Sequence, residues 1–262
     1  MNITLTDKVA MVGGATSGIG EAIAIQLASS GASLVLVARN ENKLKNTLTQ
    51  LDVSQGQEHR YLVVDFADFG HAQLIIKKFF ENNSIDILVN NTNGPLAGGI
   101  KDKTIADYQQ AFDLLFQYAV NTTLLAIPHM VKQGFGRIIN VSSLTVKEPQ
   151  DTLILSNTMR TALVSWSKSL SRDVAPNGVT VNTVLTGYFN TDRLNKLMET
   201  QAQQLDVSVE DIRDKRISSI PMKRLGRPEE YAYLVTFLAS DYAAYLTGTS
   251  LQLDGGLMTG LF

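Results

Sequence analysis

Short apolar segments alternate with helix-period stretches from one end of this chain to the other. The apolar segments span residues 9–12, 34–37, 61–64, 85–89, 137–141, 179–185 and 250–253. They are rich in β-branched residues and apolar on both faces, as strands covered on both sides must be. Strand–helix alternation of this kind specifies parallel pairing with right-handed crossovers. We therefore predict an α/β fold: a single doubly wound, Rossmann-type domain whose seven-stranded parallel sheet is flanked by helices.

The chain has no evident internal boundary. Its 262 residues contain no Pro-, Gly- or Ser-rich linker, no internal repeat and no low-complexity stretch, so we predict one domain over residues 1–262. Segment 188–226 departs from the alternation, because it is polar and helix-prone and lies between a strand and the next helix. Long excursions of this kind are more often functional than structureless, so we predict a substrate loop or lid there.

Charge and cysteine content exclude several classes of function. The formal net charge is −2 and no long basic run occurs, which argues against nucleic-acid binding. The chain has no cysteine, which excludes disulfides and thiolate nucleophiles and suits a reducing cytoplasm. Its three histidines are isolated, so no metal site is predicted. Neither a signal-peptide pattern nor a run of about 18 apolar residues is present, so we expect a cytoplasmic protein without a membrane partner.

A glycine-rich turn joins the first strand to the first helix. Gly14 permits a tight turn, Gly18 lets backbone N–H groups approach a diphosphate, and Gly20 allows the helix to pack closely on the strand. Glycines also serve ordinary turns, but the position at the first strand–helix junction of a βαβ unit favours dinucleotide binding at the helix N-terminus. The contacts expected from this turn come from Gly14, Thr16, Ser17, Gly18, Ile19 and Gly20.

The glycine spacing, G-x-x-x-G-x-G, resembles that of the short-chain dehydrogenase/reductase family. Residues 90–94, Asn-Asn-Thr-Asn-Gly, resemble the Asn-Asn-Ala-Gly turn of that family. Residues 224–230 and 253–256 are similar to its C-terminal signature, so the likeness covers nearly all of the chain. The resemblance implies further cofactor contacts by Asp65, Asn91, Gly187 and Thr191.

The end of the second strand indicates which cofactor is bound. NAD-specific sheets usually carry an acidic residue there, about 20 residues after the glycine turn, to bind the ribose 2′-hydroxyl. Here that acid is absent and Arg39 stands beside the expected position, with a planar set of donors suited to a 2′-phosphate. We therefore predict NADP(H), with NAD as the alternative if Arg39 is only a solvated loop residue.

The catalytic pattern of the family is broken. Its members use a serine, a tyrosine, a lysine four residues after the tyrosine, and an asparagine on the preceding long helix. Ser143 matches the serine, whereas Ser156 and Arg160 occupy the tyrosine and lysine positions, and Leu115 occupies the asparagine position. This combination resembles a divergent subgroup similar to 3-oxoacyl-ACP reductase but with an imperfect tetrad.

The substitutions change the proton chemistry. Ser156 is shorter and far less acidic than tyrosine, and Arg160 can hold ribose hydroxyls but stays protonated, so it passes no proton. Loss of one acid–base group typically costs about 10²–10⁴ in rate. Tyr118 and Tyr188 are conceivable substitute acids, although packing or lining roles are the simpler interpretation of both.

Two functions remain open from the sequence. The first is an NADP(H)-dependent carbonyl reductase or alcohol dehydrogenase that acts on a small molecule through an altered proton path. The second is a nucleotide-binding sensor or regulatory subunit without turnover, since fold does not determine function. The resemblance also implies a homodimer or homotetramer, with which the apolar stretches 153–166 and 257–262 agree.

Overall fold

The computed structural model describes residues 2–261 and contains the predicted parallel sheet. Its seven strands are hydrogen-bonded in the order β3-β2-β1-β4-β5-β6-β7, and every neighbouring pair is parallel. The strands are β1 (Val9–Gly13), β2 (Ser33–Ala38), β3 (Arg60–Val63), β4 (Ile87–Asn90), β5 (Gly136–Val141), β6 (Val179–Thr186) and β7 (Ser250–Leu253). The strand order reverses beside β1, where a doubly wound sheet leaves a crevice for a ligand. The predicted fold class is confirmed.

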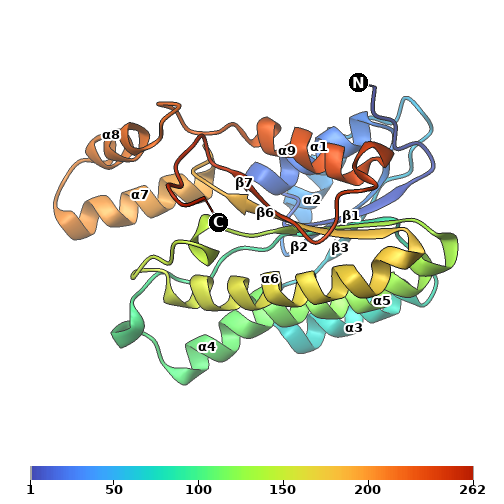
Figure 1. Cartoon of the computed structure of the whole chain (residues 1–262), viewed down its shortest axis with the longest axis horizontal. Helices are drawn as coiled ribbons and strands as arrows, with labels where there is room; N and C mark the ends of the chain where they lie inside the picture. Colours follow the sequence, from blue (N-terminus) through green and yellow to red (C-terminus); the bar gives the residue numbers. More distant parts are fainter. Residues whose placement is uncertain (1, 262) are drawn as a thin grey trace.

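Helices cover the two faces of the sheet as separate layers (Figure 1). One layer holds α1 (Gly18–Ser29), α2 (Glu41–Leu48) and α9 (Pro228–Ala239). The other holds α3 (Phe69–Phe80), α5 (Tyr118–Gln133) and α6 (Ile154–Val174), with α4 (Ile105–Phe112) leading into α5. Single 3-10 turns occur at Ile100–Asp102, Leu144–Val146, Ala175–Asn177 and Asp241–Ala243.

Side chains that alternate along each strand explain why the strands are apolar throughout. In β1, Ala10 and Val12 pack in the cluster formed with α1 and α9, whereas Met11 packs in the cluster on the opposite face. In β2, Leu34 and Val35 divide between the two clusters in the same way. Successive strand residues point to opposite faces, so a sheet between two helical layers must be apolar at every position.

One predicted strand begins later than expected. The pattern predicted 85–89, whereas β4 runs from Ile87 to Asn90. The carboxylate of Asp86 accepts the N–H of Val9 at 2.7 Å, so a side chain takes the place of a strand carbonyl at the start of this ladder. A side chain that competes for a backbone donor in this way shortens the adjoining strand.

The helical run Ile105–Gln133 is long and apolar enough, by length and composition, to cross a membrane. It comprises α4, a π-helical turn at Asp113–Gln117 and α5. Its buried residues Tyr118, Ala126 and Met130 pack in the core cluster under the sheet. Core packing therefore accounts for these buried residues of the run, whereas Ile105 and Leu124 are exposed.

Segment 188–226 folds into two helices, α7 (Asp192–Leu205) and α8 (Val209–Ser219). Figure 1 shows both helices extending away from the two layers. They enclose a small apolar cluster of their own: Leu194, Met198, Ala202, Ile212, Ile220 and Leu225. The two ends of the segment are paired, since Gly226 donates its N–H to Tyr188 and accepts that of Asn190, both at 2.9 Å. The segment is thus a compact excursion that leaves and re-enters the domain at one point.

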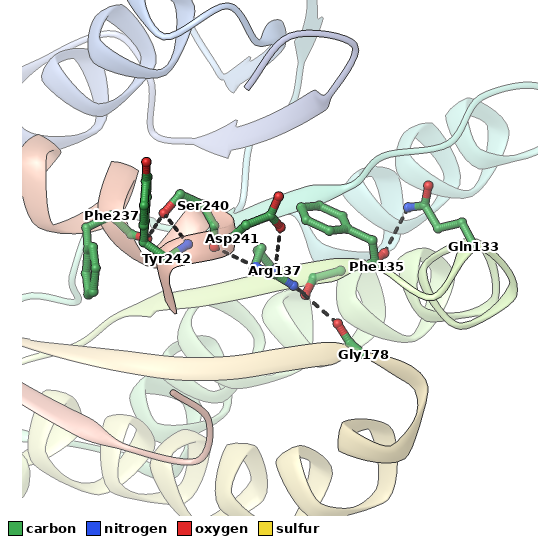
Figure 2. Close-up of polar contacts among 9 residues, drawn as sticks. Gln133, Phe135, Arg137, Gly178, Phe237, Ser240, Asp241 and Tyr242 are labelled. Atoms are coloured by element: carbon green, nitrogen blue, oxygen red, sulfur yellow. Dashed lines mark hydrogen bonds and ion pairs between the residues drawn. The ribbon is translucent and has the colours of Figure 1, made fainter. Parts of the chain in front are cut away.

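A buried arginine ties together elements at the amino end of β5 (Figure 2). The side chain of Arg137 is only 3% exposed. Its guanidinium donates to the carbonyls of Ser240 and Gly178, both at 3.2 Å, and lies 4.1 Å from the ring centre of Phe135. It also pairs with Asp241 at 3.2 Å, although the Asp241 side chain is 89% exposed. The carbonyls and the ring are therefore its main partners.

We expect Arg137→Met to lower the free energy of unfolding by about 2–4 kcal/mol, because the backbone carbonyls around it, that of Gly136 included, would lose their charged hydrogen-bond donor. The matched change Asp241→Asn should cost less than about 1 kcal/mol, because a pair with one exposed partner contributes little. Urea unfolding monitored by circular dichroism measures both values. Equal losses in the two variants would show that the ion pair, and not the carbonyl contacts, stabilises this region.

Candidate functional site

The glycine turn after β1 is packed so closely that larger side chains cannot enter it. Gly14 and Gly18 adopt φ of +59° and +54°, in the left-handed region that favours glycine. A Cβ at Gly20 would overlap the carbonyl oxygen of Gly14, and one at Gly13 would overlap the carbonyl oxygen of Asn91. These glycines therefore leave a cradle of bare backbone at the start of α1.

Asn91 holds this turn from the adjoining strand. Its Nδ2 donates to the carbonyl of Gly13 at 3.0 Å, and it would lie 2.7 Å from a Cβ at Gly20. The sequence predicted a cofactor contact for Asn91. The structure gives its amide a positioning role, because it fixes the backbone that a diphosphate would approach.

The N-terminus of α1 has no side-chain cap. Ser17 occupies the N-cap position with an exposed side chain that accepts no backbone hydrogen bond, and Thr16 before it is half-buried. By contrast, Asn40, Thr104 and Thr191 each cap their helix through a side-chain oxygen. The first N–H groups of α1 are thus left available for an anion, which the positive end of the helix dipole also favours.

Thr191 faces the glycine turn from segment 188–226. Its Cγ2 lies 3.0 Å from the position that a Cβ at Gly18 would occupy. Its Oγ1 accepts the N–H of Leu194 at 3.3 Å, so it begins α7. The structure therefore brings together Gly14, Gly18, Gly20, Asn91 and Thr191, which the sequence placed in the cofactor site.

The other four residues predicted to contact the cofactor have their own surroundings. Arg39 is exposed directly after β2, and Asp65 is exposed after β3, where its carboxylate accepts the N–H of Ala67 at 3.0 Å. Ile19 packs against the core cluster behind α1. Gly187 allows a close approach to Asp254, since a Cβ there would lie 2.6 Å from the Asp254 Cα. Ile19 and Gly187 thus have packing roles.

Ser143 is the second residue after the carboxyl end of β5. Its Oγ accepts the N–H of Thr145 at 3.2 Å, which starts a 3-10 turn at Leu144–Val146. A hydroxyl that accepts a hydrogen bond still has its own proton to donate. Ser143 is therefore oriented by the backbone while it keeps a donor for a carbonyl oxygen.

Arg160 joins Ser156 to the end of β5. Its Nε donates to the Ser156 Oγ at 3.1 Å, and its Nη1 donates to the carbonyl of Val141 at 2.8 Å. Burial, and then the nearby charge of Arg193, lower the pKa of Arg160 to about 10. The guanidinium therefore remains a cation at neutral pH. Its acceptor Val141 lies two residues before Ser143 in the chain.

The structure offers no substitute acid at either tyrosine considered from the sequence. Tyr118 is buried in the core with its ring centre 4.4 Å from that of Phe66, and burial raises its pKa, which makes it a weaker acid. The ring of Tyr188 lies 4.8 Å from the guanidinium carbon of Arg216, at the base of the 188–226 excursion. Leu115 is buried in the π-helical turn. Tyr118 therefore has a packing role, and Tyr188 contacts a charged side chain of the excursion.

Sequence reasoning missed a buried polar chain beneath the site. Asn90 donates to the Asn140 Oδ1 at 2.8 Å, and Asn140 donates to the Ser167 Oγ at 2.8 Å. These three residues join the carboxyl ends of β4 and β5 to α6. Asparagines near the carboxyl ends of two buried strands were the available signal, because such groups are buried only with partners.

Sequence reasoning also missed Arg193, in the first turn of α7. Its Nη1 donates to the carbonyl of Gly94 at 3.2 Å, which links the 188–226 excursion to the loop after β4. A side chain at Gly94 would overlap the Arg193 guanidinium. No pattern in the sequence pairs two positions so far apart.

Comparisons with known proteins cover the whole chain. A family model described as Enoyl-(Acyl carrier protein) reductase matches residues 14–258. The NADPH-dependent reductase BacG of Bacillus subtilis (strain 168) is 32% identical over 261 residues, which cover 98% of this chain and 100% of that protein. The 3-oxoacyl-[acyl-carrier-protein] reductase FabG of Rickettsia prowazekii (strain Madrid E) is 33% identical over 259 residues, covering 98% and 99%. The crystal structure of L-sorbose reductase from Gluconobacter frateurii, complexed with NADPH and L-sorbose, aligns over 100% of both chains with a TM-score of 0.91 and 28% identity.

Proposed function

Since the chain belongs to the short-chain dehydrogenase/reductase family, we propose that it is an NADP(H)-dependent oxidoreductase acting on the carbonyl group of a small molecule. The observation that carries this proposal is the glycine cradle. A Cβ at Gly13 or Gly20 would collide with backbone atoms, and the helix behind the cradle begins without a side-chain cap. A diphosphate fits such a place, because bare N–H groups and a helix N-terminus both favour an anion.

Arg39 supports the choice of NADP(H) over NAD. It is exposed and follows β2 directly, and the N–H of Ala15 in the glycine turn lies 3.5 Å from the carbonyl of Val37 near the end of that strand. The guanidinium can therefore reach the adenosine end of a dinucleotide whose diphosphate lies on the turn. Relatives named as NADPH-dependent and a relative crystallised with NADPH support the same choice.

The mechanism assigns separate roles to Ser143 and Arg160. The hydride for the substrate carbonyl carbon would come from NADPH held on the glycine turn of residues 13–20. Ser143 donates its hydroxyl proton in a hydrogen bond to the carbonyl oxygen, and Thr145 keeps that hydroxyl oriented. The positive charge of Arg160 stabilises the alkoxide that develops there, and the proton that completes the alcohol comes from water. Ser156 holds Arg160 in place through its Nε.

The alternative is a nucleotide-binding sensor or regulatory subunit without turnover. It is motivated by Ser156 and Arg160 at the positions where the family has its tyrosine and lysine. Absorbance of NADPH is followed with a panel of ketones, aldehydes, 3-oxoacyl thioesters and oxo acids at high protein concentration. Turnover with any of them supports the oxidoreductase, and tight NADPH binding without turnover supports the sensor. If calorimetry detects no uptake of NADPH or NADH by the folded protein, both proposals fail.

We expect Arg39→Asp to reverse the cofactor preference. The carboxylate repels a 2′-phosphate and can accept the ribose 2′-hydroxyl of NADH. Loss of the charged contact should weaken NADPH binding about 10- to 100-fold, since hydrogen bonds to charged groups contribute about 1.5–3 kcal/mol. Calorimetric Kd values for the two cofactors measure the change. Lys43→Asp, which places the same carboxylate on the exposed first turn of α2, should alter neither value more than twofold.

A further inference from the structure

Two arginines are anchored where β4 and β5 end, the latter being the strand that leads to Ser143, and neither arginine is paired with an acid within residues 2–261. The ion pairs within residues 2–261 involve other side chains, among them Arg137, Arg224 and Arg227. Arg160 and Arg193 nevertheless lie close enough for the charge of Arg193 to lower the pKa of Arg160. Two neighbouring guanidinium groups without a carboxylate repel each other, which makes an external anion a favourable third partner.

The two guanidinium groups are anchored near the carboxyl ends of two neighbouring strands, β5 for Arg160 and β4 for Arg193. Two contacts hold Arg160: its Nη1 donates to the carbonyl of Val141 at the end of β5, and its Nε donates to the Ser156 Oγ. Arg193 comes from α7 and donates its Nη1 to the carbonyl of Gly94. Arg193 is exposed at the surface, yet burial lowers its pKa, so protein atoms enclose part of its guanidinium.

Both groups keep unused donors. The contacts of Arg160 occupy its Nε and Nη1, and that of Arg193 occupies its Nη1, so the Nη2 of each has no protein acceptor within residues 2–261. A guanidinium offers a planar set of donors that matches a carboxylate or phosphate. The anchored contacts also orient these donors before a ligand arrives, which reduces the entropy lost on binding.

We propose that Arg160 and Arg193 bind the carboxylate of the organic substrate, which is therefore a small oxo acid or the corresponding hydroxy acid. This inference rests on the proposed oxidoreductase function and narrows its substrate class. The other source of an anionic oxygen group is the cofactor diphosphate. The substrate is the better match, because the glycine turn and the uncapped start of α1 already offer donors to the diphosphate. Arg160, in contrast, is fixed to the strand that leads to Ser143.

The test compares acids with their neutral esters on protein saturated with NADP⁺. Benzoylformate and 3-oxohexanoate are each titrated calorimetrically beside the corresponding methyl ester. We expect the acids to bind at least about tenfold more tightly than the esters, because a charged hydrogen bond is lost in each ester. Arg193→Gln should weaken acid binding about 10- to 100-fold while the Kd for NADP⁺ changes less than twofold. Lys196→Gln, which removes one exposed charge from the same helix, should leave both values unchanged.

Three other results would overturn the proposed carboxylate site, and a fourth would overturn the proposed function. If Arg193→Gln weakens NADP⁺ binding as much as acid binding, the arginine serves the cofactor phosphate and the inference is wrong. If NADP⁺ binds but acids and esters bind equally or not at all, the inference is also wrong. Reduction of a neutral ketone by a protein that ignores the acids leaves the oxidoreductase in place and removes only the carboxylate site. Failure of NADP⁺ itself to bind overturns the proposed function instead.

Discussion

Replacing Gly20 by alanine is expected to weaken NADPH binding about 10- to 100-fold, since overpacking costs about 1–3 kcal/mol and each 1.4 kcal/mol is tenfold in Kd. The added Cβ would overlap the carbonyl of Gly14 and come within 2.7 Å of the Asn91 amide nitrogen. Both contacts define the backbone on which the diphosphate is proposed to lie, so the turn must open. Calorimetric titration with NADPH measures the loss, and circular dichroism checks that the fold persists.

Gly70→Ala is the matched control, because Gly70 is also helical and belongs to the first turn of α3. A Cβ there meets nothing nearer than 3.9 Å, from the carboxylate of Asp68. Alanine is a better helix former than glycine by about 0.5–1 kcal/mol, so this variant should bind NADPH normally and unfold no earlier. If Gly20→Ala bound NADPH as tightly as the unchanged protein, the turn after β1 would not be the cofactor site.

The glycine turn illustrates what a sequence can predict. Gly14 and Gly20 are six positions apart, so their collision is a local property of a strand that turns directly into a helix. The doubly wound sheet was predictable for a related reason. Residues such as Ala10 and Met11 pack on opposite faces, and a strand buried on both sides must read as an uninterrupted apolar run. Local patterns of this kind needed no knowledge of distant contacts.

The arrangement beside Ser143 depends on contacts between distant parts of the chain. Arg193 reaches Gly94 across 99 positions, and Asn90 reaches Asn140 across 50. The side chain of Tyr118 turns into the core because Phe66, from the loop after β3, lies against it. Strand register and helix docking create these pairs, and a single sequence contains no signal for either. Motif spacing therefore selected Ser143 as a candidate, but it did not indicate the contacts that Arg160 and Arg193 make at the ends of β5 and β4.

The strongest expected effect on the reaction is that of Ser143→Ala. Removing the only assigned hydrogen-bond donor to the substrate carbonyl oxygen should lower kcat about 100- to 1000-fold, as loss of one oxyanion donor typically does. The Kd for NADPH should change less than twofold, because the nearest contact of the Ser143 Oγ is the N–H of Thr145 and not the glycine turn. Single-turnover absorbance of NADPH, with the most active carbonyl compound of the panel, separates this chemical step from binding.

Ser142→Ala is the control that distinguishes a donor from a packing hydroxyl. Ser142 is the preceding residue, it is 4% exposed, and its Oγ has no hydrogen-bond partner within residues 2–261. Its backbone N–H is held by Val184 at 2.9 Å, and alanine preserves that contact. The variant should therefore keep nearly full activity. Equal losses of activity in the two alanine variants would show that the substitutions disturb the end of β5. If Ser143→Ala kept its activity, Arg160 would be the hydrogen-bond donor to the substrate carbonyl, and Ser143 would have only its turn-forming role.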